Sequence, residues 1–373
     1  MSEKEHSTVK QEKSAKSEPL FHITKRADMS LKRSILARLI AILASFTIMS
    51  VVLFIMSNEN PFVLISSMFG RVFSPEANNI WILFSETAIL LGIALALTPA
   101  FKMKFWNCGG EGQVMIGSLV AAMTMFFIGD SVSLPVLIAL AAVFSILAGG
   151  FWGLLPAIFK AKWNVNETLF TLMMNYIAIQ FIRFFLKLCG NAQGNLDPMP
   201  FAIPTIFGST YFLNIALILI ICIVMYVYLR FSKQGYEISV VGESENTAKY
   251  IGINVPKVII RTMIISGALC GIIGFLLVAN GSSTVTDTLA DGRGFTAILV
   301  SWLGKFNPLY MILTSFLVVF LQRGTTFLGE QYRFDTSMAD IFIGAVLLFI
   351  IGCEFFINYK INFRKRSKEV TKQ

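Results

Sequence analysis

Three carboxylates interrupt long apolar runs in the first half of the chain: Glu86, Glu111 and Glu167. A carboxylate at membrane depth costs kilocalories unless it faces other helices or water, so such residues mark ion pairs, proton relays or substrate pathways. A buried carboxylate that its surroundings make easier to protonate can also couple transport to a proton gradient. The polar residues around each acid therefore decide which chemistry is open to it.

The first polar cluster is the segment Trp106–Gln113, which reads WNCGGEGQ. Asn107 and Glu111 are four residues apart and share one face of a helix, which Ser118 continues. The three glycines allow close backbone approach or an irregular helix start. The segment is either a helix entry with interfacial polar residues or, with Gln113, part of the wall of a translocation pathway.

The second cluster is a polar stripe that begins at Asn166. Glu167, Thr171 and Asn175 follow at helical spacing within an otherwise apolar stretch. Because polar groups inside a membrane avoid lipid, we expect this stripe to face the interior of a helical bundle. The stripe can either contact a substrate or join neighbouring helices, and the sequence leaves both readings open.

The third cluster is the polar, glycine-flanked stretch Gly281–Gly294, which precedes a short apolar piece at 294–304. Transporters build sites near the middle of the membrane from such broken helices, because the ends of half-helices offer backbone dipoles to the substrate. We assign Phe295 to this pathway. A plain extracellular loop would have a similar sequence.

Several kinds of catalytic site are missing from the sequence. It has no GxxxxGK[ST] phosphate-binding loop, so a separate ATPase or an ion gradient must supply any energy. Both histidines lie in the N-terminal tail, and the five cysteines are scattered without a CxxC pair. We therefore expect no catalytic residue, no metal site and no cofactor in this chain, which we take to be no enzyme.

Composition predicts an all-α, polytopic transmembrane helical bundle. Hydrophobic residues make up 55% of the chain and charged residues 14%, with a mean hydropathy of +0.70. A membrane-spanning helix needs roughly 20 apolar residues. Residues 61–70 are expected to be interfacial, and 294–304 is too short to span as a helix. The predicted spans are 35–56, 79–99, 110–128, 133–158, 166–188, 211–230, 258–279, 307–322 and 339–358.

The distribution of lysine and arginine predicts the orientation. If the N-terminus is cytoplasmic and the short piece counts as a tenth membrane segment, 25 of the 31 basic residues lie inside and 6 outside. Both termini are then cytoplasmic, and the net charge of +9 reflects this bias rather than nucleic-acid binding. The predicted domains are a disordered tail (1–33), a transmembrane domain (34–359) and a basic C-terminal tail (360–373).

The stretch 231–257 is the longest polar segment between spans and is expected to face the cytoplasm. Gly235 and Gly242 punctuate it, and Ser244 can cap a short helix that ends before Gly252.

Two pairs of small residues four apart, Gly149/Gly153 and Gly267/Gly271, predict helix-packing seams.

In combination these segments resemble the permease subunits of bacterial nucleoside importers, within the branched-chain amino acid/ribose permease superfamily of ABC transporters. The resemblance runs in order over about residues 80–350. It rests on WNCGGEGQ at 106–113, Asn166-Glu167, NYIA at 175–178, Gly235-Tyr-Glu237, Val241-Gly242, Ala248, Tyr250, GIN at 252–254, SGALCG at 266–271, GFTAI at 294–298, Leu303-Gly304 and Asn307-Pro308. Departures from the family pattern include Cys108, Gly110, Ser239 and Arg293.

The resemblance implies a multi-pass protein of the bacterial cytoplasmic membrane, surrounded by lipid, that conducts a small-molecule substrate. It implies three partners: a second permease, a cytoplasmic ATP-binding cassette protein that holds ATP and Mg, and an extracellular substrate-binding protein or lipoprotein. It also makes 231–257 the segment that couples to the ATPase, through Gly235, Glu237, Gly242, Glu243, Ala248 and Gly252. Replacing Gly242 or Glu243 is then expected to uncouple ATP hydrolysis from transport without changing expression.

Two other functions remain open at this stage. The same class of importer could carry sugars or branched-chain amino acids. A secondary transporter or channel could instead use Glu86, Glu111 and Glu167 as proton-coupling groups.

Overall fold

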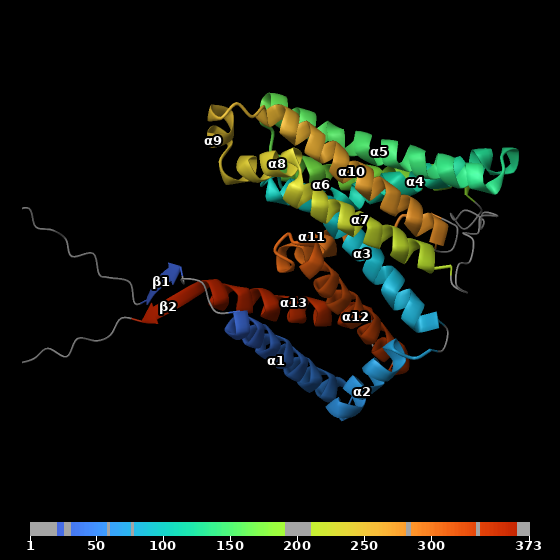
Figure 1. Ribbon diagram of the computed structural model, residues 1–373. Coiled ribbons are helices and arrows are strands. Elements are labelled where there is room, and N and C mark those ends of the chain that lie inside the picture. Colours follow the sequence, from blue (N-terminus) through green and yellow to red (C-terminus); the bar gives the residue numbers. More distant parts are fainter. Residues whose placement is uncertain are drawn as a thin grey trace, which may run out of the picture. The chain divides into compact units, whose positions relative to one another are not determined.

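The computed structural model describes residues 21–25, 31–57, 60–75, 78–190, 210–280, 285–332 and 336–363 (Figure 1). The chain divides into two compact units. One comprises residues 50–343, and the other combines residues 1–49 with 344–373.

In the described part of the chain, seven helices are long and apolar enough to cross a membrane. They coincide with seven of the predicted spans and confirm an all-α membrane fold. They are α3 (Asn79–Lys102), α4 (Gly110–Ile128), α5 (Leu134–Trp163), α6 (Glu167–Cys189), α7 (Phe212–Phe231), α10 (Val255–Asn280) and α12 (Pro308–Tyr332).

Helix α12 extends ten residues beyond its predicted end at residue 322. The predicted span stops one residue before Arg323. The helix continues because Glu86 of α3 neutralises the Arg323 guanidinium. An ion pair between helices thus lets a charged residue lie within an apolar segment.

The unit of residues 50–343 also contains short helical elements. Helix α2 (Pro61–Val72) is capped by Asn60, whose side chain accepts a hydrogen bond from the Phe62 amide at 2.9 Å. A single 3-10 turn, η2 (Gly129–Ser131), follows α4. Helix α11 (Arg293–Leu303) has 11 residues and is about 16 Å long, which agrees with the expectation that it cannot span as a helix.

The cytoplasm-facing segment of the prediction is more helical than expected. Gly235 and Gly242, which were predicted to punctuate it, lie inside helix α8 (Lys233–Glu243). Helix α9 (Glu245–Tyr250) has Ser244 as its N-cap, accepting from the Thr247 amide at 3.2 Å, as predicted. Gly252 follows α9 with a φ of +86°, the left-handed conformation expected of a glycine after a helix end.

Glycines hold α10 against its neighbours, and Figure 1 draws α10 alongside α5. A Cβ on Gly267 would overlap the carbonyl oxygen of Gly149, and one on Gly271 would overlap that of Ser145. A Cβ on Gly153 would overlap the carbonyl of Met263. The predicted small-residue seams are therefore confirmed as sites of direct backbone contact between α5 and α10.

The other unit contains β1 (Phe21–Lys25), β2 (Tyr359–Phe363) and most of α1 (Leu31–Ser57) and α13 (Thr336–Asn358). The strands pair antiparallel. The two helices coincide with the first and last predicted spans. Strand β1 and the first residues of α1 fall within the predicted tail, 1–33, whose disorder stays a prediction.

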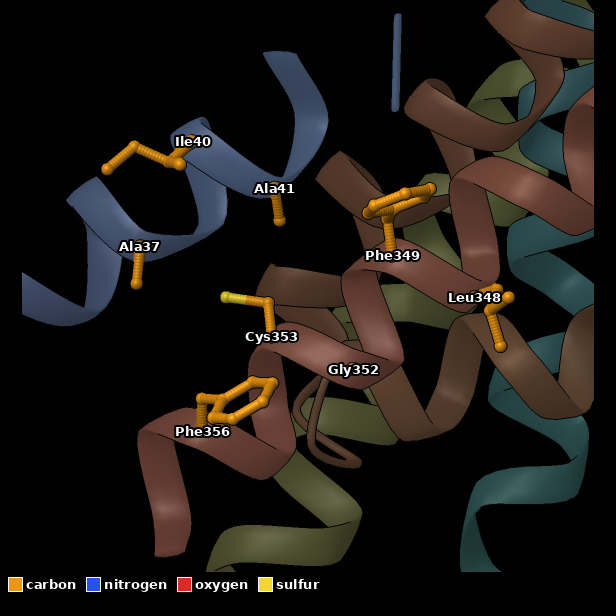
Figure 2. Close-up of a pocket in the computed structure, with 8 residues that line it drawn as sticks. All are labelled: Ala37, Ile40, Ala41, Leu348, Phe349, Gly352, Cys353 and Phe356. Atoms are coloured by element: carbon orange, nitrogen blue, oxygen red, sulfur yellow. The ribbon is translucent and has the colours of Figure 1, made fainter. Parts of the chain in front are cut away.

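A cavity of about 540 Å³ lies between α1 and α13 within this unit. In Figure 2, Ala37 and Ala41 of α1 face Cys353 of α13 across it. Its walls are otherwise aliphatic and aromatic, with Phe349 and Phe356 among them. Such a lining offers few hydrogen bonds to a polar cargo.

Candidate functional site

The first polar cluster forms a closed network at the start of α4. The Asn107 side-chain amide donates to Oε1 of Gln113 at 3.3 Å and to Oγ of Ser266, on α10, at 3.2 Å. The Gln113 amide donates back to Oδ1 of Asn107 at 3.3 Å. Asn107 and Gln113 are buried, so these amides satisfy each other where α4 meets α10.

Side chains of the second cluster, on α6, hold the turn that precedes α4. The Asn175 side chain donates to the Cys108 carbonyl at 2.9 Å and accepts from the Gly112 amide at 2.8 Å. Thr171 accepts from the Cys108 amide at 3.2 Å. Burial raises the pKa of the Cys108 thiol, and the negative charge of Glu167 raises it further. Thr171 and Asn175 thus join helices.

Glu111 closes the third cluster. Its carboxylate accepts hydrogen bonds from the backbone amides of Gly292 at 2.8 Å and Gly294 at 2.6 Å. These amides belong to the N-terminus of α11, where Gly292 has a φ of +69°. The half-helix dipole that the sequence offered to a substrate is therefore directed at a carboxylate of the same chain.

The remaining candidates of the stripe lie at the N-terminus of α6. Glu167 forms an ion pair with Lys160 at 2.9 Å. Asn166 caps α6 by accepting from the Leu169 amide at 3.1 Å. Phe295, on α11, exposes 45% of its surface. Whether any of these residues contacts cargo stays a prediction.

Glu86 lies in a different environment, a cavity of about 240 Å³ between α3, α7, α10, α11 and α12. Arg323 donates to both Glu86 oxygens, from Nη2 to Oε1 at 2.7 Å and from Nε to Oε2. Arg293 Nη2 lies 3.6 Å from Glu86 Oε1. One carboxylate and two guanidiniums leave this end of the cavity with an excess positive charge. The lining residues are Ile82, Ser85, Glu86, Ile89, Tyr211, Asn214, Leu276, Leu277, Arg293 and Arg323.

Asn214 contributes an unusual polar group to the same cavity. Its side chain is fully buried, and neither Nδ2 nor Oδ1 has a hydrogen-bond partner. Aliphatic side chains such as Ile89 and Leu276 also line the cavity. The cavity thus combines a charged end, an amide without partners and apolar walls, the composition expected of a small-molecule site.

Sequence reasoning found only part of this cavity. Glu86 was a candidate, and Arg293 was noted as a departure from the family pattern. Asn214 and Arg323 were missed, although each is a polar residue in a strongly apolar helix. That signal was sufficient to flag them as functional candidates.

The predicted coupling residues divide into packed and exposed groups. A Cβ on Gly242 would overlap the carbonyl oxygen of Lys102 at the end of α3, and one on Gly235 that of Tyr228. Ala248 is buried. Glu237 forms an ion pair with Arg261 of α10 at 3.0 Å. These four residues attach α8 and α9 to the transmembrane helices.

Glu243 and Gly252 are the exposed candidates, and α8, α9 and the turn after α9 also carry large exposed side chains. Tyr250 exposes 92% of its surface, Tyr236 62% and Ile251 52%. We call Tyr236, Glu243, Tyr250 and Ile251 the α8–α9 surface. Because Gly242 contacts α3, we expect its replacement to disturb folding. A Gly242 variant would then not uncouple ATP hydrolysis from transport at normal expression, as the sequence suggested.

The family described as "Branched-chain amino acid transport system / permease component" matches residues 79–351, most of the chain. The chain belongs to this permease family. The match begins at the first residue of α3 and includes the cavity and α8–α9.

Individual relatives of this permease have different cargoes in their names. A guanosine ABC transporter permease of Bacillus subtilis is 29% identical over 74% of this chain and 79% of the relative. A glucose ABC transporter permease of Haloferax volcanii is 26% identical over 73% and 75%. A nucleoside ABC transporter permease of Lactococcus lactis is 25% identical over 91% and 97%. The comparison with solved structures gave no match.

Family and fold together establish the class. The protein is a multi-pass membrane permease of the ABC transporter type, a transport subunit like its relatives rather than an enzyme.

Proposed function

We propose that this permease forms the translocation pathway for nucleosides in an ABC importer of the bacterial cytoplasmic membrane. The observation that carries the proposal is the cavity around Glu86. It holds charged, amide and apolar groups within one small volume, in a chain whose relatives include nucleoside permeases. Its volume of about 240 Å³ is below the roughly 300–1,000 Å³ usual for ligand sites, so the cavity would widen to admit a nucleoside.

The topology we propose has ten membrane segments and cytoplasmic termini. The charge bias supports it, as does the position of α11 after a polar stretch that continues from α10. In this arrangement the non-helical residues 285–292 and helix α11 (Arg293–Leu303) together form one of the ten membrane segments. The hydrogen bonds from the α11 backbone amides to Glu111 satisfy groups that lipid cannot.

The energy is proposed to come from a separate cytoplasmic ATPase that binds the α8–α9 surface. Helix α3 offers a direct mechanical link. Its last residue, Lys102, contacts Gly242 of α8, and its Glu86 lies in the cavity about 24 Å away along the helix. A movement of α8 would therefore reach the ion pair that joins α3 to α12. Pro99 interrupts the hydrogen bonding of α3 near the α8 contact, where a bend would be easiest.

The remaining partners follow from the same assembly. A second permease is supported by the two guanosine ABC transporter permeases of Bacillus subtilis, both of which resemble this chain. An extracellular binding protein or lipoprotein would deliver the cargo. ATP and Mg would be bound by the ATPase, and this chain would have no nucleotide-hydrolysing site of its own.

A sugar cargo is the second candidate, because a glucose permease is also among the relatives. The aliphatic walls beside Asn214 favour a cargo with a flat apolar face, which a nucleobase has and a hexose lacks. Proton coupling has less support. Glu86 pairs with Arg323, Glu167 with Lys160, and Glu111 accepts two backbone amides, so none of the three is an unpaired acid.

The cargo is tested by measuring uptake of labelled uridine, guanosine and glucose in cells with and without the gene. We expect deletion to abolish most uptake of one or both nucleosides, to confer resistance to a toxic nucleoside analogue, and to leave glucose uptake unchanged. Loss of glucose uptake with intact nucleoside uptake would select the sugar alternative.

A further inference from the structure

We propose that the Asn214 carboxamide recognises the hydrogen-bonding edge of the nucleobase, by pairing with a donor and an acceptor that lie next to each other on the base. This inference rests on the proposed function, since it assigns a role within the same cavity. It makes Asn214 a residue that determines which cargo passes.

The first argument is the cost of leaving Asn214 as it is. A buried polar group without a partner costs about 1–3 kcal/mol, and nearly all such groups in folded proteins have partners. In the described part of the chain, Asn214 is the residue with two buried side-chain polar atoms that both lack a hydrogen-bond partner. An aliphatic residue would avoid this cost in a helix that is otherwise strongly apolar.

The second argument is where the amide lies. Asn214 lines the cavity that also contains Glu86, Arg293 and Arg323. Its amide oxygen and nitrogen are shielded from water in this structure, so a base pairs with them when the cavity wall beside Asn214 opens to admit the cargo. Glu86, Arg293 and Arg323 form the charged end of the cavity, where they could bind the hydroxyl groups of a ribose.

The third argument is the chemistry of a carboxamide. It presents one acceptor and one donor side by side, and a side chain of this kind pairs in two contacts with an adjacent donor and acceptor on a base. Uracil offers N3–H beside O4, guanine N1–H beside O6, and adenine its amino group beside N1. Purine riboside has N1 without the neighbouring amino group, so it can satisfy only half of the amide.

The apolar walls complete the recognition. Ile82, Ile89, Leu276 and Leu277 line the cavity with the amide. They suit the faces of a planar base, while the amide contacts its edge. A sugar without a base would leave these walls against polar hydroxyl groups.

The test compares initial uptake rates of adenosine, guanosine and purine riboside by the complete transporter, for the wild type, Asn214→Leu and Asn214→Asp. The ratio of variant rate to wild-type rate for each cargo cancels the preference of the binding protein, which is unchanged. Effects on folding or coupling change all three cargoes equally and cancel between cargoes. Asn246→Asp, on the exposed surface of α9, is the matched control.

Relative to the wild type, Asn214→Leu should lower the ratio of adenosine to purine riboside uptake at least about tenfold, because the wild-type amide discriminates against a base that leaves it unpaired. An ionised carboxylate in Asn214→Asp only accepts hydrogen bonds. Guanosine, with two adjacent donors, should therefore gain about tenfold over adenosine relative to the wild type. Asn246→Asp should keep the wild-type ratios.

Unchanged cargo ratios in both Asn214 variants would overturn the inference alone. A wild-type complex that carries no nucleoside at all would overturn the proposed function, and this inference with it. If the leucine variant fails to insert into the membrane, the nearly isosteric aspartate variant decides.

Discussion

The ion pair between α3 and α12 allows a quantitative prediction, because Glu86 serves two arginines unequally. Arg323 contacts it through two hydrogen bonds, whereas Arg293 approaches one oxygen to 3.6 Å. The three side chains are about a quarter exposed. Removing each partner in turn should therefore destabilise the protein by different amounts.

The largest loss is expected for Glu86→Gln, which leaves two guanidiniums facing each other without a carboxylate. Breaking a buried pair costs about 3–5 kcal/mol, and partial exposure lowers our figure to about 2–4 kcal/mol. Arg323→Met leaves Glu86 with Arg293, so we expect about 1–2 kcal/mol. Arg293→Met preserves the two-bond pair and should cost about 0–1 kcal/mol.

The assay is thermal stability of the purified complex in one detergent, read as the temperature at which half of it remains monodisperse. At roughly 2–4 °C per kcal/mol, Glu86→Gln should melt about 4–16 °C below the wild type. The double variant Glu86→Gln/Arg323→Met should lose less than the sum of the two single variants. The reasoning is wrong if Arg293→Met is as harmful as Glu86→Gln, or if the double variant is fully additive.

Three further predictions concern other parts of the chain. Gly267→Leu should abolish stable expression because its side chain would overlap the α5 backbone, while Gly344→Leu, with open space around it, should express normally by quantitative immunoblot. Glu111→Ala should lower the melting temperature by several degrees, since it leaves two backbone amides at the α11 N-terminus unpaired, at about 1–3 kcal/mol each; an unchanged melting temperature would contradict this role. Tyr250→Ser with Glu243→Ala should keep expression but reduce cargo-stimulated ATP hydrolysis and uptake together at least about tenfold; wild-type uptake would exclude the α8–α9 surface as the ATPase contact.

The helices could be predicted because their signal is local. Seven apolar runs match seven helices, and glycines spaced four apart lie at the seams between α5 and α10. The cap at Ser244 and the glycine after α9 were also readable from residue types alone. These features depend on neighbours in sequence, which the sequence contains in full.

The cavity could not be assembled in the same way, because its partners are far apart in the chain. Glu86 and Arg323 are separated by 237 positions, and only folding brings them together. Asn107, Glu111 and Asn175 look like pathway residues in the sequence. In the structure their polar atoms form hydrogen bonds with other residues of the same chain. A single sequence does not distinguish such residues from residues that bind a cargo.

The most direct test of the account is nucleoside uptake by proteoliposomes that contain this permease with its partner permease, ATPase and binding protein. We predict uptake of labelled nucleoside that requires ATP on the ATPase side and stops when the ATPase is catalytically inactive. Uptake by the isolated chain, driven by a pH gradient without ATP, would contradict the account.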